Sequence, residues 1–136
     1  LSATAPTATN LARAGTATAS STSSYYYAAS KAIDGDTSTY WRSSSAGTQW
    51  LRIDLGSAKT ISKVVVSWLD TRYARAYRVE TSNDGTTWAT QYSTTSGASG
   101  TQTITFAPVN ARYVRVYCTT ANDYDYRISE LQVWGY

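Results

Sequence analysis

The chain has 136 residues, a length that favours one domain with a single hydrophobic core. Its net charge is +3 with 15% charged residues, and the basic residues are scattered along the chain, which argues against a nucleic-acid-binding protein. Histidine is absent and Cys118 is the one cysteine, which excludes Ser-His, Cys-His and imidazole–zinc chemistry and any disulfide within the chain.

The first nine residues are mostly Thr, Ala and Pro, a composition typical of linkers between the modules of secreted enzymes. We therefore expect a linker over residues 1–9 and one folded domain over residues 10–136. No apolar run approaches the roughly 20 residues that a membrane span needs. The 12 tyrosines and 5 tryptophans favour strands over helices.

Residues 16–22 form a stretch of small residues that predicts a strand, and residues 23–27 end in three consecutive tyrosines. Three neighbours cannot all point the same way in a regular element, so at least one should reach solvent or a ligand. Residues 28–33 have the length of one helical turn. They lead into Asp34-Gly35-Asp36, which is a turn signal.

The turn at Asp34 gathers two carboxylates with the hydroxyls of Thr37 and Thr39. Such oxygens suit Ca²⁺, and a solvated turn with a capping carboxylate is the alternative. An EF-hand loop is excluded because Thr39 and Ser45 occupy the positions that require Gly and Glu.

Seven further segments complete a pattern of about eight strands with turn signals every 8–12 residues, which is typical of an all-β antiparallel sandwich. They span residues 50–55, 61–69, 76–82, 88–93, 101–106, 112–119 and 128–134. In the first, Leu51, Ile53 and Leu55 share one face, and Val114, Val116 and Cys118 do so in the sixth. The segment 61–69 is expected to be covered on both faces, Trp88 to lie in the core, and Pro108 to end a strand.

Two stretches combine aromatic rings with Asp, Asn and Arg, at residues 68–73 and 122–127. Sugars pack their C–H faces on aromatic rings and take hydrogen bonds from these polar groups. Tyr124 and Tyr126 are the leading candidates for a sugar contact. Trp68 is in phase with Val64 and Val66, so a core position is the alternative for it.

Carboxylate catalysis would need two acids across an open cleft, and Asp70 with Asp123 or Asp125 is the remaining combination. A β-sandwich of 136 residues preceded by a linker is a poor candidate for a complete hydrolase. We therefore expect a protein without catalytic activity.

Five blocks in order around Lys31–Trp41 give a family resemblance: Asn10-Leu-Ala12 before it, and Gln49–Gly56, Tyr77–Trp88, Ala111–Val116 and Ile128–Gly135 after it. Their sequence and spacing resemble the discoidin, or coagulation factor 5/8 type C, family, and especially its bacterial branch, carbohydrate-binding module family 32. The resemblance implies a discoidin-like jelly-roll β-sandwich that binds a carbohydrate with the loops at one end.

Carried over residue by residue, the resemblance implies two sets of site residues. The ligand-binding set is Tyr26, Tyr27, Arg42, Trp68, Asp70, Arg72, Tyr73, Asn122, Asp123, Tyr124 and Tyr126. The set for a structural Ca²⁺ is the Lys31 carbonyl, Asp34, Asp36, Thr39 and Glu130. Trp41 is expected to pack beneath the loop.

Members of the family that bind galactose typically use a His, which this chain lacks. The combination of acids and tyrosines is more similar to modules attached to bacterial glucanases and chitosanases. The expected function is thus a secreted, monomeric module that tethers a polysaccharide-degrading enzyme of the same parent chain to its substrate. The alternatives are an anionic uronate polysaccharide, terminal galactosides, or a membrane or protein adhesion module. The membrane role is not favoured because the matching loops carry Ser and Tyr instead of apolar spikes.

Overall fold

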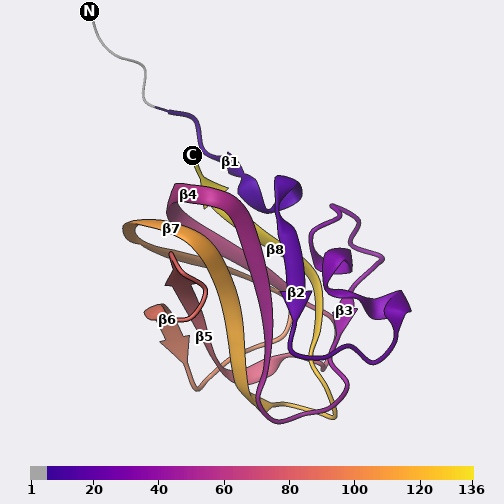
Figure 1. The fold of residues 1–136 in the computed structure, drawn as a ribbon. Helices are drawn as coiled ribbons and strands as arrows, with labels where there is room; N and C mark the ends of the chain where they lie inside the picture. Colours follow the sequence, from indigo (N-terminus) through magenta and orange to yellow (C-terminus); the bar gives the residue numbers. More distant parts are fainter. Residues whose placement is uncertain (1–5) are drawn as a thin grey trace, which may run out of the picture.

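Strands make up most of the computed structural model, which describes residues 6–136 (Figure 1). Three short 3-10 helices precede most of them: η1 (Leu11–Ala14), η2 (Tyr25–Tyr27) and η3 (Ala29–Ala32). The strands are β1 (Thr9–Asn10), β2 (Thr16–Ala19), β3 (Trp41–Arg42), β4 (Gln49–Trp68), β5 (Ala74–Ser82), β6 (Ala89–Thr94), β7 (Thr101–Ala121) and β8 (Arg127–Gly135).

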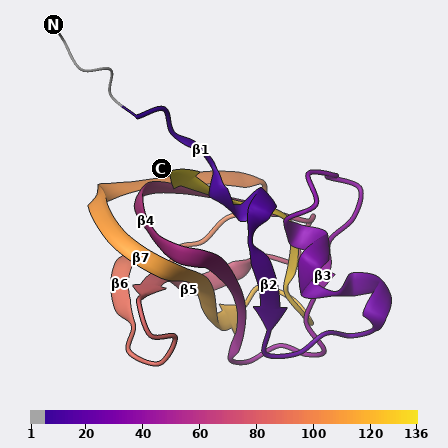
Figure 2. The same cartoon turned by 45° about the horizontal axis from the view of Figure 1, so that its top comes forward.

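Two antiparallel layers arise because β4 and β7 bend and take part in both. The first part of β4 pairs with β2 and with the end of β7, which also pairs with β5, and β5 pairs with β6. The second part of β4 pairs with β8 and with the start of β7, and β1 and β3 pair with β8. Figure 2 shows β4 and β7 curving across the molecule. The expected antiparallel discoidin-like β-sandwich is confirmed.

The core lies between the layers and follows the predicted alternation. Leu51, Ile53 and Leu55 of β4 are buried, and so are Val114, Val116 and Cys118 of β7. Burial also raises the pKa of the Cys118 thiol, in keeping with a structural role for this residue. Each large apolar side chain removed from water contributes about 1.5–3 kcal/mol.

Trp41, expected to pack beneath the loop of residues 34–39, is part of the core. Its side chain is 0% exposed, and its Nε1 donates a hydrogen bond to the Ser21 carbonyl at 3.0 Å. This indole therefore ties the segment after β2 to the core.

Two predicted strand ends are wrong, because Gly56 and Pro108 lie inside continuous strands. Gly56 adopts φ +87°, a conformation that favours glycine, where the pairing of β4 with β7 is interrupted between Asp54 and Lys59. Pro108 lies in a bulge of β7, where a residue without a backbone N–H is tolerated. Both breaks in the sequence pattern mark the bends that carry a strand from one layer to the other.

Three other expectations also need correction. The segment 61–69 has a strand on either side, but the outward side chains Lys63, Val65 and Ser67 stay partly exposed, so it is not covered on both faces. Trp88 precedes β6 and is partly exposed, because its ring stacks on Arg115 outside the core, with the guanidinium carbon 4.0 Å from the ring centroid. Of the predicted linker 1–9, residues 1–5 lie outside the described part of the chain and Thr9 belongs to β1. Within residues 6–136 there is no helix with the length and hydropathy to span a membrane.

Candidate functional site

Three loops meet at one end of the sandwich: the segment from η2 to β3, the β4–β5 loop of residues 69–73, and the β7–β8 loop of residues 122–126. Backbone hydrogen bonds hold them together. The Arg127 amide donates to the Arg72 carbonyl at 2.9 Å, the Asn122 amide to the Tyr73 carbonyl at 3.1 Å, and the Ser43 amide to the Tyr126 carbonyl at 3.0 Å. We call this the loop end. It brings together the loops that the family resemblance assigns to the ligand.

The loop end is centred on the carboxylate of Asp125, which is 5% exposed. It accepts hydrogen bonds from Arg42 Nε at 2.8 Å, Arg72 Nη1 at 3.3 Å and Arg127 Nε at 3.1 Å. A buried carboxylate is tolerated only when it is paired and hydrogen-bonded. Because the three arginines come from three segments, this one acid fixes the relative positions of all three loops.

Aromatic rings surround this ion cluster. Tyr124 is 78% exposed, and the Arg72 guanidinium lies 5.3 Å from its ring centroid. Tyr27 stacks on Tyr40 with ring centroids 4.9 Å apart, and the Arg42 guanidinium lies 5.6 Å from the Tyr27 centroid. The arginines that bind Asp125 therefore also orient the rings that face solvent.

Two of the polar residues predicted to bind the ligand, Asp123 and Asn122, already form hydrogen bonds within the protein. Asp123 accepts a hydrogen bond from the Thr71 hydroxyl at 3.1 Å and lies 3.8 Å from Arg72. Asn122 donates to the Thr71 carbonyl at 3.0 Å and accepts from Arg75 Nε at 2.8 Å. These two side chains mainly connect the β4–β5 loop to the β7–β8 loop.

Asp70 is exposed and takes part in no ion pair among residues 6–136. Its backbone has φ +52°, which Asp tolerates better than most residues. The Asp70 carbonyl accepts a hydrogen bond from the Ser99 hydroxyl at 2.6 Å, which supports this strained turn. Asp70 is therefore the acid of the loop end whose carboxylate is available to a ligand.

Two predicted ligand contacts are wrong because the rings lie in the core. Trp68 is 4% exposed and packs against the edge of Tyr77, with ring centroids 5.4 Å apart. Tyr126 is 0% exposed, and its hydroxyl donates to the Gly47 carbonyl at 2.6 Å. Tyr126 stabilises the loop end from inside. Tyr73 is partly buried against the core, whereas Tyr26 is 69% exposed and available.

The predicted set of ligand-binding residues missed two contributors to this end. Tyr40 supports Tyr27, and the guanidinium of Arg127, a residue of the predicted stretch 122–127, lies 5.8 Å from the Tyr40 centroid. Tyr25 is 78% exposed and lies beside Tyr26, with ring centroids 4.6 Å apart. No sequence signal marks Tyr40, because its partner Tyr27 is distant in the chain. The run of three tyrosines did indicate that some would be exposed.

In the loop of residues 31–39, several oxygen atoms lie close to the Thr39 hydroxyl. The Thr39 hydroxyl lies 2.5 Å from Asp34 Oδ2, 2.9 Å from the Asp36 carbonyl and 3.4 Å from the Lys31 carbonyl. No group of three His, Cys, Asp or Glu side chains with metal-binding geometry occurs within the described chain. A cation here would thus be held by carbonyl and hydroxyl oxygens together with carboxylates, a mixture that suits a hard ion such as Ca²⁺.

Glu130 of β8 lies next to this loop and is 5% exposed. Its carboxylate accepts a hydrogen bond from the Gly35 amide at 3.1 Å. Burial raises the pKa of Glu130, and the nearby charges of Asp34 and Asp36 raise it further, while the Gly35 amide and Arg13 act in the opposite direction. Arg13, whose guanidinium lies against Gly35, and Lys31 are the positive charges near these acids, so a bound cation would share the compensation of their charge with two side chains.

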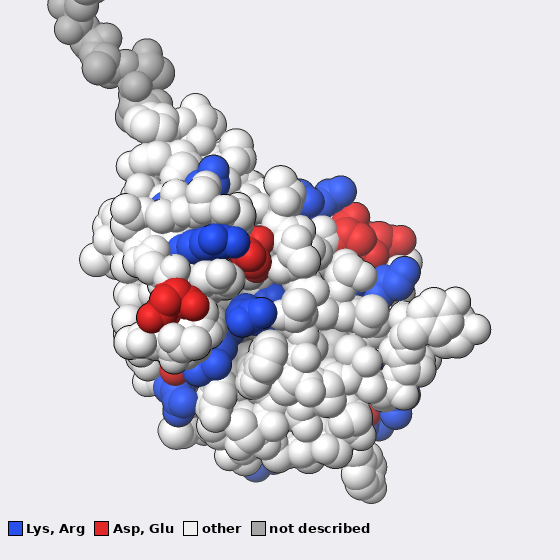
Figure 3. Space-filling model, in the orientation of Figure 1, with Lys and Arg blue, Asp and Glu red and all other residues white. Residues whose placement is uncertain are grey.

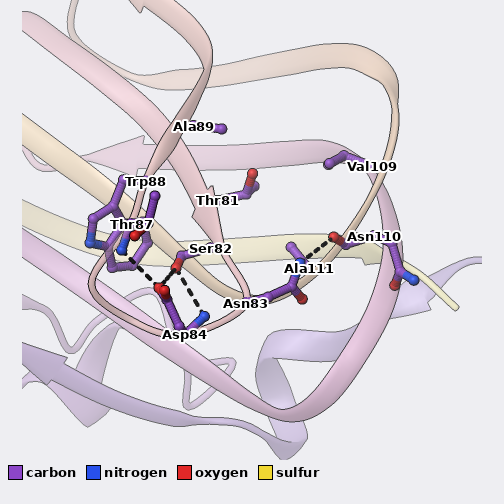
Figure 4. A pocket seen from close by; sticks show the side chains of 10 residues that line it. All are labelled: Thr81, Ser82, Asn83, Asp84, Thr87, Trp88, Ala89, Val109, Asn110 and Ala111. Atoms are coloured by element: carbon purple, nitrogen blue, oxygen red, sulfur yellow. Dashed lines mark hydrogen bonds between the residues drawn. The ribbon is translucent and has the colours of Figure 1, made fainter.

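A hollow of about 400 Å³ lies at the opposite end, between the turn that follows β5 and the bend of β7 (Figure 4). Asp84 is the acid that lines it. Hydrogen bonds from the amides of Thr87 at 2.7 Å and Thr86 at 2.9 Å and from the Ser82 hydroxyl at 2.9 Å lower the pKa of Asp84 and bind its carboxylate to the turn. This hollow therefore offers no pair of free acids for catalysis.

Comparison with known proteins gives a consistent result. Residues 16–131 match the family model of the F5/8 type C domain. The chain is 41% identical in sequence to chitosan-binding module 1 of a chitosanase/glucanase from Paenibacillus sp. IK-5. The crystal structure of that module superimposes with a TM-score of 0.88, and the match covers 93% of this chain and 99% of that one. The chain is also 41% identical to chitosan-binding module 2 of the same enzyme in complex with chitotriose, with a TM-score of 0.87, covering 93% of this chain and 100% of that one.

Two more distant matches extend the comparison. The family 32 carbohydrate-binding module of Clostridium perfringens NanJ, in complex with galactose, is 25% identical with a TM-score of 0.83, covering 93% of this chain and 98% of that one. A polysaccharide lyase 8 family protein, HylA of Enterococcus faecalis, is 31% identical over 88 residues, which is 62% of this chain and 6% of the lyase. The chain thus spans a small part of that curated relative.

Proposed function

The chain belongs to the F5/8 type C domain family, and from this premise we propose that it is a non-catalytic carbohydrate-binding module. The observation that carries the proposal is Tyr124, an exposed ring held by Arg72 above the buried Asp125 cluster at the loop end. An aromatic ring with hydrogen-bonding groups beside it is the arrangement that a sugar needs, because its C–H face stacks and its hydroxyls bond at the same time. The 41% identity with two modules named as chitosan-binding supports the proposal.

The state of the acids and of the thiol supports the proposal that the module is non-catalytic. Histidine does not occur in the sequence and Cys118 is 0% exposed. Of the two possible partners of Asp70, Asp125 is bound by three arginines. Asp123 is engaged by the Thr71 hydroxyl at 3.1 Å and lies 3.8 Å from Arg72. A glycosidase needs two free carboxyls on either side of the bond that is cleaved.

The ligand that we propose is a glucosamine- or glucose-based polysaccharide. Asp70 is exposed and outside the ion pairs of the loop end, so it can accept hydrogen bonds from an ammonium group or from hydroxyls. The Asp125 carboxylate cannot bind the ligand in this way, because three arginines already occupy it. Terminal galactosides and uronates are the alternative ligands for the same loops.

We further propose that the module acts by local concentration. A weak site joined to a catalytic module of the same parent chain keeps that module near its substrate, without new contacts in the active site. Secretion is part of this proposal, because an insoluble polysaccharide lies outside the cell. We also propose that the module is a monomer.

A structural Ca²⁺ completes the proposal. The Lys31 and Asp36 carbonyls, Asp34 and the Thr39 hydroxyl would hold the ion, with Glu130 beside them. The ion would supply positive charge among three acids. By joining the loop of residues 31–39 to β8, it would stabilise the fold without taking part in sugar binding.

The test is retention of the module on a panel of insoluble polysaccharides: chitosan, chitin, α- and β-glucans, gelled alginate and gelled pectin. We expect retention on chitosan or a β-glucan. Tyr124→Ala should weaken it roughly tenfold, because losing a stacking contact removes about 1.4 kcal/mol. Asp70→Ala should also weaken it, and both variants should keep the melting temperature of the parent.

The matched control is Tyr136→Ala, since Tyr136 is 51% exposed but lies at the far end of β8 from the loop end. Its removal should leave retention unchanged. If the parent passes through every polysaccharide, the carbohydrate-binding proposal is wrong. If the parent is retained on a polysaccharide and Tyr124→Ala is retained equally well, the assignment of the site to the loop end is wrong.

A further inference from the structure

The outer face of the layer formed by β4, β7 and β5 carries arginines and aromatic rings side by side. Strand pairing places Trp50 beside Tyr117 and Tyr117 beside Arg78, and in the next row Arg52 beside Arg115. Trp88 lies against Arg115 at the edge. We call this set the basic-aromatic face. None of these residues belongs to the three loops of the loop end, and Figure 3 shows several separate Lys and Arg patches on this side of the molecule, with acidic patches between them.

The arginines of this face are held by the rings. The Arg115 guanidinium carbon lies 4.0 Å from the Trp88 centroid and 4.6 Å from the Tyr117 centroid, and that of Arg78 lies 4.6 Å from the Tyr117 centroid. Arg52 lies 5.8 Å from the centroid of Trp50. Stacking fixes the plane of a guanidinium, so these donors lose little freedom when they bind a ligand.

The hydrogen bonds of these arginines use the Nε atom. Arg52 Nε donates to the Thr18 hydroxyl at 3.2 Å, while Arg78 Nε and Arg115 Nε donate to Glu80 at 3.2 Å and 2.7 Å. Their Nη atoms have no acceptor among the described side chains. These outer atoms are the fork that binds a carboxylate or a sulfate with two parallel hydrogen bonds.

The charge of the face is unbalanced. Glu80 is 5% exposed and shared by Arg78 and Arg115, and Asp54 is bound by Arg112 at 2.9 Å and 3.0 Å. Arg52 forms no ion pair within residues 6–136 and stands directly opposite Arg115 in the sheet. Like charges directly opposite each other destabilise a sheet. Glu80 offsets this repulsion in part through its ion pair with Arg115 at 2.7 Å, and a ligand anion beside Arg52 would offset the rest.

We propose that the basic-aromatic face is a second binding surface, which takes a polysaccharide that carries carboxylates. The Nη atoms of Arg52 and Arg78 bind the carboxylates of neighbouring uronate residues, and the exposed parts of Trp50 and Tyr117 contact the sugar rings between them. The proposal goes beyond the neutral or amino sugar assigned to the loop end.

The composition of the face favours a glycan over other anionic partners. A membrane surface needs apolar side chains that enter the lipid, and this face has aromatic rings lying flat under arginines. Non-specific binding of nucleic acid needs several uncompensated cations along the backbone. Here the arginines exceed the acids by only two, which is few for a nucleic-acid surface but enough to pair with two carboxylates of a glycan.

The experiment measures binding of soluble polygalacturonate by affinity electrophoresis, with a neutral dextran in a parallel gel. We expect retardation by polygalacturonate that weakens as salt is raised. Arg52→Gln should reduce the affinity roughly fivefold, and the double variant Arg52→Gln with Arg78→Gln roughly twentyfold, since separate contacts of this type are nearly additive.

The matched control is Lys63→Gln. Lys63 also stacks on an aromatic ring, with its Nζ atom 4.8 Å from the Trp134 centroid, but it lies in the part of β4 that pairs with β8. Tyr124→Ala separates the two surfaces, because it should lower retention on chitosan or β-glucan and leave polygalacturonate binding unchanged. A loss of polygalacturonate binding in Tyr124→Ala but not in Arg52→Gln would overturn the proposal. So would an equal loss in Lys63→Gln, an absence of retardation of the parent, or tighter binding of double-stranded DNA than of polygalacturonate.

Discussion

Replacing Asp125 with Asn should destabilise the protein strongly, although it changes one atom of the side chain. The carboxylate is 5% exposed and binds three guanidinium groups that are 35%, 23% and 19% exposed. Breaking a buried ion pair by removing one partner costs about 3–5 kcal/mol. Because the arginines retain partial contact with water, we expect a loss of about 2–3 kcal/mol in the free energy of unfolding.

A loss of this size should lower the melting temperature by about 8–12 °C, since 1 kcal/mol shifts a domain of this length by about 4 °C. Urea unfolding followed by tryptophan fluorescence measures the free energy, and calorimetry measures the melting temperature. Polysaccharide retention should also fall, because Arg42, Arg72 and Arg127 would no longer hold the loops in one arrangement.

The control is Asp123→Asn in the same loop. Its side chain is 32% exposed and 3.8 Å from Arg72, so the expected change is under about 0.5 kcal/mol. If Asp125→Asn and Asp123→Asn were equally stable, the view of Asp125 as the group that organises the loop end would be refuted.

Three further outcomes are expected. Asp34→Ala should remove the gain in melting temperature that added Ca²⁺ gives the parent, and a gain equal to that of the parent would contradict the proposed site. Burial raises the pKa of Glu130, so in metal-free protein its contribution to stability is greatest when it is protonated and is lost as pH rises through its raised pKa. Glu130→Gln should therefore make urea unfolding in EDTA less dependent on pH above about 4.5, and a pH profile identical to the parent's would argue against this. Gly135→Ala would place a Cβ against the Thr60 carbonyl, closer than the two atoms can approach, and should cost about 2–3 kcal/mol, whereas an unchanged urea midpoint would show that the chain end can move away.

The regular part of the fold is predictable from the sequence because alternation maps directly onto burial. Leu51, Ile53 and Leu55 occupy the expected inner face, and so do Val114 and Val116. The number of strands agrees for a different reason. Two predicted pairs of strands are the single bent strands β4 and β7, while β1 and β3 have two residues each and leave no periodic signal.

The site is predictable in location but not in detail. Tyr124 and Tyr126 differ by two positions and would share a face in an extended strand, yet one is 78% and the other 0% exposed. The bends between them break the alternation on which such an argument depends. The role of Asp125 depends on Arg42, which is 83 residues away, and no local pattern reports a contact of that range.

The pairing of Thr9 with Gly135 has a mechanical consequence. Figure 1 shows the chain entering and leaving at the same edge, while β8 runs from there to the loop end. Tension applied between Thr9 and Gly135 would act across the hydrogen bonds between β1 and β8, so these bonds would break one after another. Tension between Gly135 and a polysaccharide held at the loop end would instead run along β8, loading its hydrogen bonds with β4 together. A bound module pulled from its C-terminal side should accordingly resist far more force than a free one stretched between its two ends.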